Sequence, residues 1–273
     1  MDRAGSTRHV VTASLLWNLA CAPGPAAPPT PHPTPSATLA APAPSAAPSA
    51  PPTTTAPSAA PVPTARPVPP APTPALAVVE RPITYDEPRR QRTIAYRRRH
   101  QDPDADDITI EPRMIILHYT GGGDLDSTWR YFDRPTVEKA REVVARAGDL
   151  NVSAHFLVDR DGTIVRLMPE TWMARHCVGL NHLAIGVENV ADGGPHPLTD
   201  AQVAADVALV RDLKARFPGI THLIGHHEYL ALEGHPYFRE RDPNYRTRKG
   251  DPGPAFMRRV RAELADLALA GPP

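Results

Sequence analysis

The chain has 273 residues, enough for one or two domains, and its 30 basic and 30 acidic side chains give a formal net charge of zero. This balance excludes a global attraction to nucleic acid, and two cysteines are too few for a disulfide scaffold. Prolines are concentrated near the start, where 20 of the 35 fall between Pro23 and Pro74. We therefore expect one folded domain over residues 81–270, preceded by a segment of a different kind.

The first 21 residues resemble an export signal. Arg3 and Arg8 precede a mostly apolar run that ends at Cys21. Leu19-Ala20-Cys21 resembles the end of a bacterial lipobox, in which the cysteine is lipidated and becomes the mature N-terminus, although Asn18 departs from that pattern. The alternative is an unprocessed, disordered N-terminus.

Residues 22–78 are rich in Pro, Ala, Ser and Thr. Such a tract buries too little apolar surface to offset the entropy lost on ordering, so we expect a disordered, partly polyproline linker. If Cys21 is acylated, Cys177 has no partner, and a small buried residue is the expected role for it.

The remaining sequence alternates helix and strand patterns. Asp86 is a candidate N-cap for an arginine-rich helix to His100, whose basic face we expect to be solvated and paired with nearby acids; contact with an anionic polymer is the alternative. Further helices are expected at 127–132 and 136–147, after Thr199, and after Pro254; strands are expected at 114–117, 152–158, 163–167, 184–190 and 220–225. Asp159-Arg160-Asp161-Gly162 predicts a hairpin turn. The pattern predicts an α/β fold with a mixed central sheet covered by helices.

Two histidines follow apolar strands, at positions where metal ligands are often placed. His118 follows the apolar strand that begins at Met114, and His226 follows the apolar strand expected at 220–225. Lys249-Gly250-Asp251-Pro252-Gly253 precedes the last helix. A catalytic zinc takes three protein ligands and keeps one open position. Residue spacing alone is a weak signal, because the chain has 12 histidines and most could be surface or core residues.

An ordered set of short motifs resembles the zinc-dependent N-acetylmuramoyl-L-alanine amidases, the family that includes phage lysozyme-type amidases and animal peptidoglycan recognition proteins. The motifs are Leu117-His118-Tyr119-Thr120, Val152-Ser153-Ala154-His155-Phe156, Asp161-Gly162-Thr163-Ile164, Ala174-Arg175-His176, Ile185-Gly186-Val187-Glu188, Gly225-His226 and Lys249-Gly250-Asp251-Pro252-Gly253.

The resemblance implies a role for seven residues. His118, His226 and Asp251 would bind Zn²⁺, with His227, His235 and Asp242 as alternatives, and Cys177 could intrude. Glu188 would be the catalytic carboxylate, and Lys249 would face the reacting carbonyl. His155 and His176 would bind substrate in the pocket, with core and loop positions as the respective alternatives. Ala154 stands where phage enzymes have a catalytic tyrosine, which groups this chain with members that rely on the glutamate.

The segment between His226 and Asp251 is longer than the resemblance leads one to expect. Because both of its ends are fixed near the expected metal, we predict that Glu228–Arg248 forms a wall of the cleft that sets substrate choice. The alternative is a loop folded back on a neighbouring helix.

The resemblance implies hydrolysis of the amide between N-acetylmuramic acid and L-alanine in peptidoglycan. A non-catalytic peptidoglycan-binding protein of the same fold is the alternative, but such members usually lack a zinc ligand. We expect a monomer that is exported to the cell envelope, held by a lipid anchor, and acting on peptidoglycan or muropeptides in the periplasm or wall.

Overall fold

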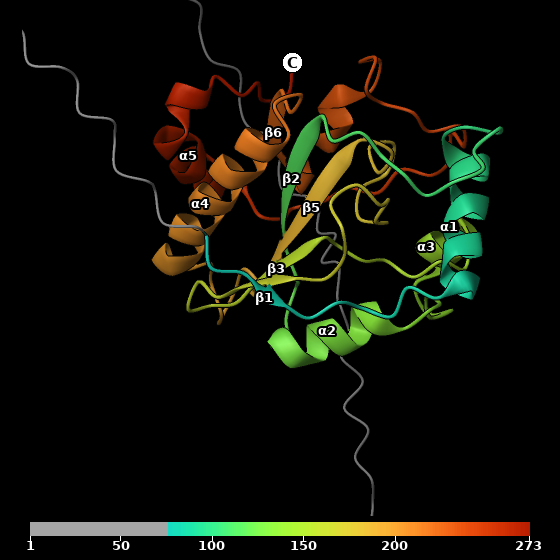
Figure 1. Cartoon of the computed structure of the whole chain (residues 1–273), viewed down its shortest axis with the longest axis horizontal. Coiled ribbons are helices and arrows are strands. Elements are labelled where there is room, and N and C mark those ends of the chain that lie inside the picture. Colours follow the sequence, from blue (N-terminus) through green and yellow to red (C-terminus); the bar gives the residue numbers. More distant parts are fainter. Residues whose placement is uncertain (1–75) are drawn as a thin grey trace, which may run out of the picture. The chain divides into compact units, whose positions relative to one another are not determined.

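The computed structural model describes residues 76–273, and its helices and strands form a mixed sheet with helices on both faces (Figure 1). The expectations for an export signal, a lipobox and most of the linker concern residues outside this range. Among residues 76–273, no helix has both the length and the apolar character needed to cross a membrane.

The sheet has six strands in the order β1-β4-β3-β5-β2-β6. Four pairs of neighbours run parallel, and only β3 and β4, joined by the predicted turn at 159–162, run antiparallel. The mixed sheet predicted from the sequence is therefore confirmed. The strands are β1 (Val79–Glu80), β2 (Met114–Tyr119), β3 (Phe156–Val158), β4 (Ile164–Arg166), β5 (Ala184–Asn189) and β6 (His222–Gly225).

Each face of the sheet has its own core, because side chains alternate along a strand. Ile115 and Leu117 of β2 pack with α4 (Asp200–Arg216) and α5 (Pro254–Glu263), which lie together on one side in Figure 1. Met114 and Ile116 face the other side. That side carries α1 (Glu87–His100), α2 (Leu125–Asp133), α3 (Glu142–Arg146) and the 3₁₀ helix η1 (His226–Leu232); a second 3₁₀ turn, η2 (Ala265–Leu267), follows α5.

Local sequence accounts for several helix boundaries. Asp86 caps α1 by accepting a hydrogen bond from the backbone of Arg89, as its position predicts. Thr199 and Gln202 form the predicted capping box at the start of α4. Four of the six arginines of α1 bond within the domain, for example Arg97 to Asp107 at 2.6 Å, so most of the basic face is paired internally.

The helix predicted at 136–147 is mostly wrong, since only α3 forms there. Its first residues pair with the chain that follows instead: Thr136 forms a β-bridge with Leu150, and the Val137 backbone donates to the Asp149 carbonyl oxygen at 3.0 Å. Arg175, 2 % exposed, holds that following chain by donating to the backbone oxygens of Val144, Gly148 and Leu150. The predicted strand 152–158 is also shorter, because Ser153 bonds to the backbone of Arg175 instead of to a neighbouring strand.

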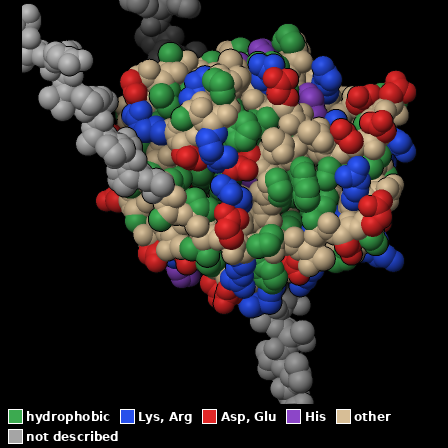
Figure 2. Space-filling view, in the orientation of Figure 1, with side chains coloured by type: hydrophobic (Ala, Val, Ile, Leu, Met, Phe, Trp, Pro, Cys, Tyr) green, Lys and Arg blue, Asp and Glu red, His purple; other side chains and the backbone are tan. Residues whose placement is uncertain are grey.

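Acidic and basic side chains are interspersed over the face shown in Figure 2, with apolar side chains between them, as the zero net charge suggests.

Candidate functional site

The register of three parallel strands brings His118, Glu188 and His226 to the same level of the sheet. His118 pairs with Glu188 across β2 and β5, and Leu117 pairs with Gly225, the residue before His226. All three lie on the face of Met114 and Ile116, because alternation gives even-numbered residues of these strands that side. The ends of separate chain segments thus meet at one edge, where ligands commonly bind in parallel sheets.

Asp251 completes a compact cluster of three donor atoms. Its Oδ2 lies 2.9 Å from His226 Nδ1 and 3.3 Å from His118 Nδ1, and the two Nδ1 atoms are 2.9 Å apart. The loop carrying Asp251 is tied to the end of β6, because the His227 backbone donates to the Asp251 carbonyl oxygen at 2.8 Å. The sequence prediction placed these same three residues together.

The donor set fits a zinc ion. Zinc bonds of about 2.0–2.1 Å in a tetrahedral arrangement place ligand atoms about 3.3 Å apart, close to the three distances observed. In residues 76–273, these three side chains are the group of His, Cys, Asp or Glu close enough to hold a metal ion. His227 lies outside it and turns its Nδ1 to the Asp251 carbonyl oxygen at 3.1 Å.

Electrostatics keep these groups in the forms that bind metals. Burial lowers the pKa of His226 to about 3, although the Asp251 carboxylate opposes this change. Burial pushes the pKa of Asp251 upward, but the charges and hydrogen bonds of His226 and His118 outweigh that effect and hold it well below the usual value. At neutral pH, His226 is therefore neutral and Asp251 ionised, as metal ligands must be.

Glu188 and Lys249 are the charged side chains beside the cluster. Glu188 Oε1 lies 3.9 Å from His118 Nδ1, and its side chain is 13 % exposed. Burial raises the pKa of Glu188 to about 7, with His118 as the main opposing influence. Burial lowers the pKa of Lys249, while Asp251 raises it. Glu188 can therefore exchange a proton near neutral pH, as a general acid–base group requires.

His176 lies directly behind His118. Its Nδ1 is 3.0 Å from His118 Nε2, and its Nε2 is 3.1 Å from the Ala184 carbonyl oxygen. A proton on each Nε2 satisfies both bonds, so His118 donates to His176 and is left with a free lone pair on Nδ1. His176, which the resemblance placed among the substrate-binding residues, is therefore positioned to orient the His118 ring as a metal ligand.

His155, which the resemblance placed among the substrate-binding residues, lies in the core. Its ring is fully buried. Nδ1 accepts a hydrogen bond from the Gly186 backbone at 3.0 Å, and Nε2 lies 2.8 Å from the Trp172 carbonyl oxygen. Burial lowers the pKa of His155 to about 4, so the ring is neutral. It supports β5 by accepting the hydrogen bond from the Gly186 backbone.

The alternative ligands lie elsewhere. His235 packs on His222 and Tyr237, with ring centroids 5.4 Å and 5.0 Å away, and Asp242 bonds the Asn244 backbone. Cys177 is a free, buried cysteine, as predicted, and burial raises the pKa of its thiol well above the usual value.

Residues 240–245 of the segment Glu228–Arg248 fold back on α1, which was the alternative considered above, while Tyr229 stacks on Phe238 within the segment. Tyr229 and Tyr245 are both buried. Glu240 pairs with His100 at 2.8 Å, and Arg241 bonds to the Arg98 carbonyl oxygen at 2.8 Å.

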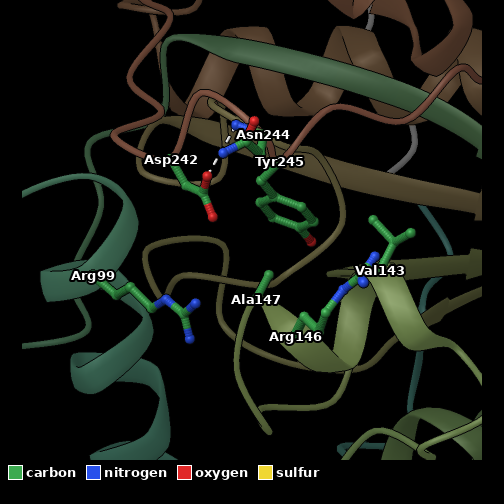
Figure 3. A pocket seen from close by; sticks show the side chains of 7 residues that line it. All are labelled: Arg99, Val143, Arg146, Ala147, Asp242, Asn244 and Tyr245. Atoms are coloured by element: carbon green, nitrogen blue, oxygen red, sulfur yellow. Dashed lines mark hydrogen bonds between the residues drawn. The ribbon is translucent and has the colours of Figure 1, made fainter.

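The segment does border a hollow of about 510 Å³, which Figure 3 shows from close by. Arg99 comes from α1, Val143 and Arg146 from α3, and Asp242, Asn244 and Tyr245 from the segment itself; Ala147 completes the lining. None of the metal-cluster residues lines this hollow, so it is a separate feature of the surface.

Comparison with known proteins assigns the family. Residues 109–254, which include the whole cluster, match the model described as N-acetylmuramoyl-L-alanine amidase. The chain belongs to this amidase family. The match begins in the segment before β2 and ends where α5 begins, so it includes β2 to β6 and the metal cluster but not β1, α1, most of α5 or η2.

Relatives of this amidase include bacterial and phage proteins. The 1,6-anhydro-N-acetylmuramyl-L-alanine amidase AmpD of Enterobacter cloacae is 29 % identical over 158 residues, 54 % of this chain and 76 % of that protein. An endolysin of Klebsiella phage KP32 is 32 % identical over 107 residues, 37 % of this chain and 70 % of its own length. Among solved structures, the endolysin amidase LysCS from Clostridium intestinale is 22 % identical with a TM-score of 0.44, covering 69 % of this chain and 95 % of its own.

The sequence carried one signal that the motif comparison did not use. Gly186 interrupts an apolar strand, and a glycine there often marks a close approach. In the structure, the His176 ring lies over it: a Cβ on residue 186 would lie 2.7 Å from His176 Cγ.

This contact gives a first prediction. Gly186→Ala should displace the His176 ring, break its bond to His118, and weaken zinc binding about tenfold or more, the range for partners that orient metal ligands. Competition with a chelator measures the affinity. In a His176→Ala background, the Gly186→Ala change should have little further effect, because the clashing ring is gone.

Gly194→Ala is the matched control, since a Cβ there meets only the Asp192 carboxylate at 3.7 Å. An equal loss of affinity from Gly186→Ala with and without His176 would contradict the explanation.

Proposed function

We propose that this amidase binds zinc at His118, His226 and Asp251 and hydrolyses the amide between N-acetylmuramic acid and L-alanine. The observation that carries the proposal is the convergence of three metal-ligand side chains beside a carboxylate with a raised pKa, inside the matched amidase domain. Zinc, when bound, polarises the amide carbonyl and lowers the pKa of a bound water towards about 7.

Glu188 is placed to move the proton in this reaction. As a carboxylate it takes a proton from the attacking water, and as a carboxylic acid it returns the proton to the leaving amine. Its pKa of about 7 makes both forms accessible at neutral pH. One of its oxygens, Oε2, is buried and has no hydrogen-bond partner among residues 76–273, so no bond within the described chain fixes its proton.

Lys249 supplies positive charge on the same side. Its ammonium group interacts with the charges of Asp251 and Glu188, and it is largely buried. A cation held in a site of low polarity stabilises negative charge that develops on a carbonyl oxygen in the transition state. The positions of Glu188 and Lys249 support catalysis over peptidoglycan binding alone.

The relatives support a peptidoglycan fragment as substrate, because one is named for the anhydro-muramyl–L-alanine amide that it cleaves. Export, lipid attachment at Cys21 and a monomeric state remain our proposals. They derive from the sequence of residues 1–78, which resembles a signal followed by a linker. A tether of about 3.1 Å per residue in polyproline form would let a membrane-held enzyme reach the wall.

The metal assignment can be tested by substitution. His118→Ala, His226→Ala or Asp251→Ala should each abolish tightly bound zinc, because each removes one atom of the cluster. His227→Ala is the matched control and should keep the metal, since its Nδ1 faces a backbone oxygen. Metal analysis of the purified proteins decides; loss of zinc from His227→Ala with retention in His226→Ala would reverse the assignment.

The role of Glu188 can be tested separately. Glu188→Gln keeps the shape of the side chain but cannot accept a proton, so turnover of a muropeptide should fall about a hundredfold or more. Bound zinc should remain, because Glu188 lies outside the donor cluster. Near-normal hydrolysis by a folded, zinc-loaded Glu188→Gln protein would remove this residue from the mechanism.

We also infer that Glu228–Arg248 affects substrate choice through the hollow of Figure 3. The residue before α3, Arg141, lies close enough for its charge to act on Glu188 and Lys249, and α3 ends at Arg146 in the hollow. Five helical residues span about 8 Å, which roughly three extended peptide residues also span. Arg99 and Arg146 could then pair with a carboxylate of the stem peptide.

This inference predicts a change in selectivity. Arg99→Ala with Arg146→Ala should lower the rate on muropeptides with long stems several-fold relative to those with a dipeptide stem, while zinc is retained. Arg258→Ala, an exposed arginine on α5, is the control. Unchanged rate ratios would show that the hollow has no part in substrate choice. Shortening the segment is a poorer test, because it removes core residues.

A further inference from the structure

Two polar side chains on the buried face of α4 reach the carboxyl ends of the central strands. Gln202 and Asp206 are one turn apart, and both are completely buried. Gln202 Nε2 donates to the carbonyl oxygens of Val158, at the end of β3, and of Val190, just after β5, at 3.2 Å and 3.1 Å. Asp206 bonds to Asn189 at the end of β5, the strand next to β2.

Asn189 links Asp206 to the strand that carries His118. It is the last residue of β5 and, by alternation, faces α4 while Glu188 faces the metal cluster. Its Nδ2 donates to Asp206 Oδ2 at 3.0 Å and to the His118 carbonyl oxygen at 3.2 Å. Both hydrogens of the amide are therefore used, one for each acceptor.

The remaining oxygens indicate the protonation state of Asp206. Asp206 Oδ1 and Asn189 Oδ1 are both buried and have no hydrogen-bond partner in residues 76–273. An ionised Asp206 would be a buried charge with no cation bonded to it, and it would leave two acceptors unsatisfied, which is costly. A proton on Oδ1 removes the charge and supplies a donor. Burial also raises the pKa of Asp206 to about 7, against the effect of the Asn189 bond.

We propose that Asp206, in its protonated form, is a positioning residue that holds Asn189 and, through it, the backbone of His118. Asn189 and His118 flank the point where Glu188 and the metal ligands leave the sheet, and the Thr120 backbone bonds to the Asn189 carbonyl oxygen at 2.9 Å. Loosening this contact shifts the ligand and the carboxylate relative to each other, and a displacement of about 1 Å can cost roughly a hundredfold in rate.

The proposal is tested with two substitutions of similar size. Asp206→Asn cannot ionise but can still accept from Asn189 and donate to its Oδ1, so zinc affinity and kcat should stay within about twofold of the original. Asp206→Leu removes both bonds and should lower zinc affinity, measured by chelator competition, about tenfold. kcat should fall by a similar factor with KM unchanged, and the conservative variant should thus rescue what leucine loses.

Asp206→Leu could fold poorly because it leaves Asn189 unpaired, so Asn189→Leu/Asp206→Leu serves as the second variant. It removes both polar side chains that would otherwise be left unpaired, and it should show the same loss of zinc affinity, because the His118 carbonyl oxygen lacks its side-chain donor. Asp212→Leu is the control on the same helix, where the aspartate pairs with Arg216 at the surface. Original zinc affinity and kcat in either leucine variant would overturn the proposal.

The proton itself has a separate signature in thermal stability. The folded-state pKa of Asp206 is raised from 3.8 to about 7, so its contribution is fully present below pH 4 and is lost as pH rises through 7. Between pH 5 and pH 8, the Tm of the original protein should therefore fall relative to that of Asp206→Asn. If the Tm of the original protein and that of Asp206→Asn changed with pH in parallel, Asp206 would not be protonated in the folded protein.

The zinc and Tm measurements do not depend on amidase activity. The zinc measurement rests on the proposed metal site and the kcat measurement on the proposed hydrolysis, whereas the Tm measurement rests on neither. An inactive protein with the predicted zinc and Tm changes would refute the hydrolysis and not the role of Asp206.

Discussion

The parallel register of β5, β2 and β6 is the constraint on which the site depends. Because His118 pairs with Glu188 and Leu117 pairs with Gly225, two histidines and a carboxylate reach one edge at the same height without any loop to arrange them. A slip of one residue would turn all of these side chains to the opposite face. The hydrophobic cores on both faces hold the register, since each strand is buried on both sides.

A second layer of neutral polar groups supports this edge. His176 and His155 lie behind the cluster on one face of the sheet, and both give their ring protons to backbone oxygens or receive backbone protons. On the opposite face, Asn189 and Asp206 bond the same strand end. The donor atoms are thus held by uncharged groups, while ionised Asp251 remains within the cluster itself.

The segment Glu228–Arg248 shows how an insertion can be both structural and adjacent to a site. The ring contact of Tyr245 with His100 and the His100–Glu240 pair attach it to α1. Tyr229 also bonds the Thr247 backbone in both directions, so the chain returns to Lys249 and Asp251 in a fixed position. The segment therefore stabilises the loop that supplies the third ligand, whatever contact its hollow makes with substrate.

The sequence by itself determined the mixed sheet, most helix starts and the three donor residues, because strand periodicity, capping residues and motif order are local properties. It did not determine the fate of 136–147, where Thr136 and Val137 bond to Leu150 and Asp149 and are not part of a helix. Nor could it place His155, His176 or Asp206, because a polar residue in an apolar pattern is equally compatible with a site or a core. Only tertiary contacts show which groups each of these side chains bonds to. A buried side chain whose hydrogen-bonding atoms are occupied by the protein supports the site and does not bind a ligand.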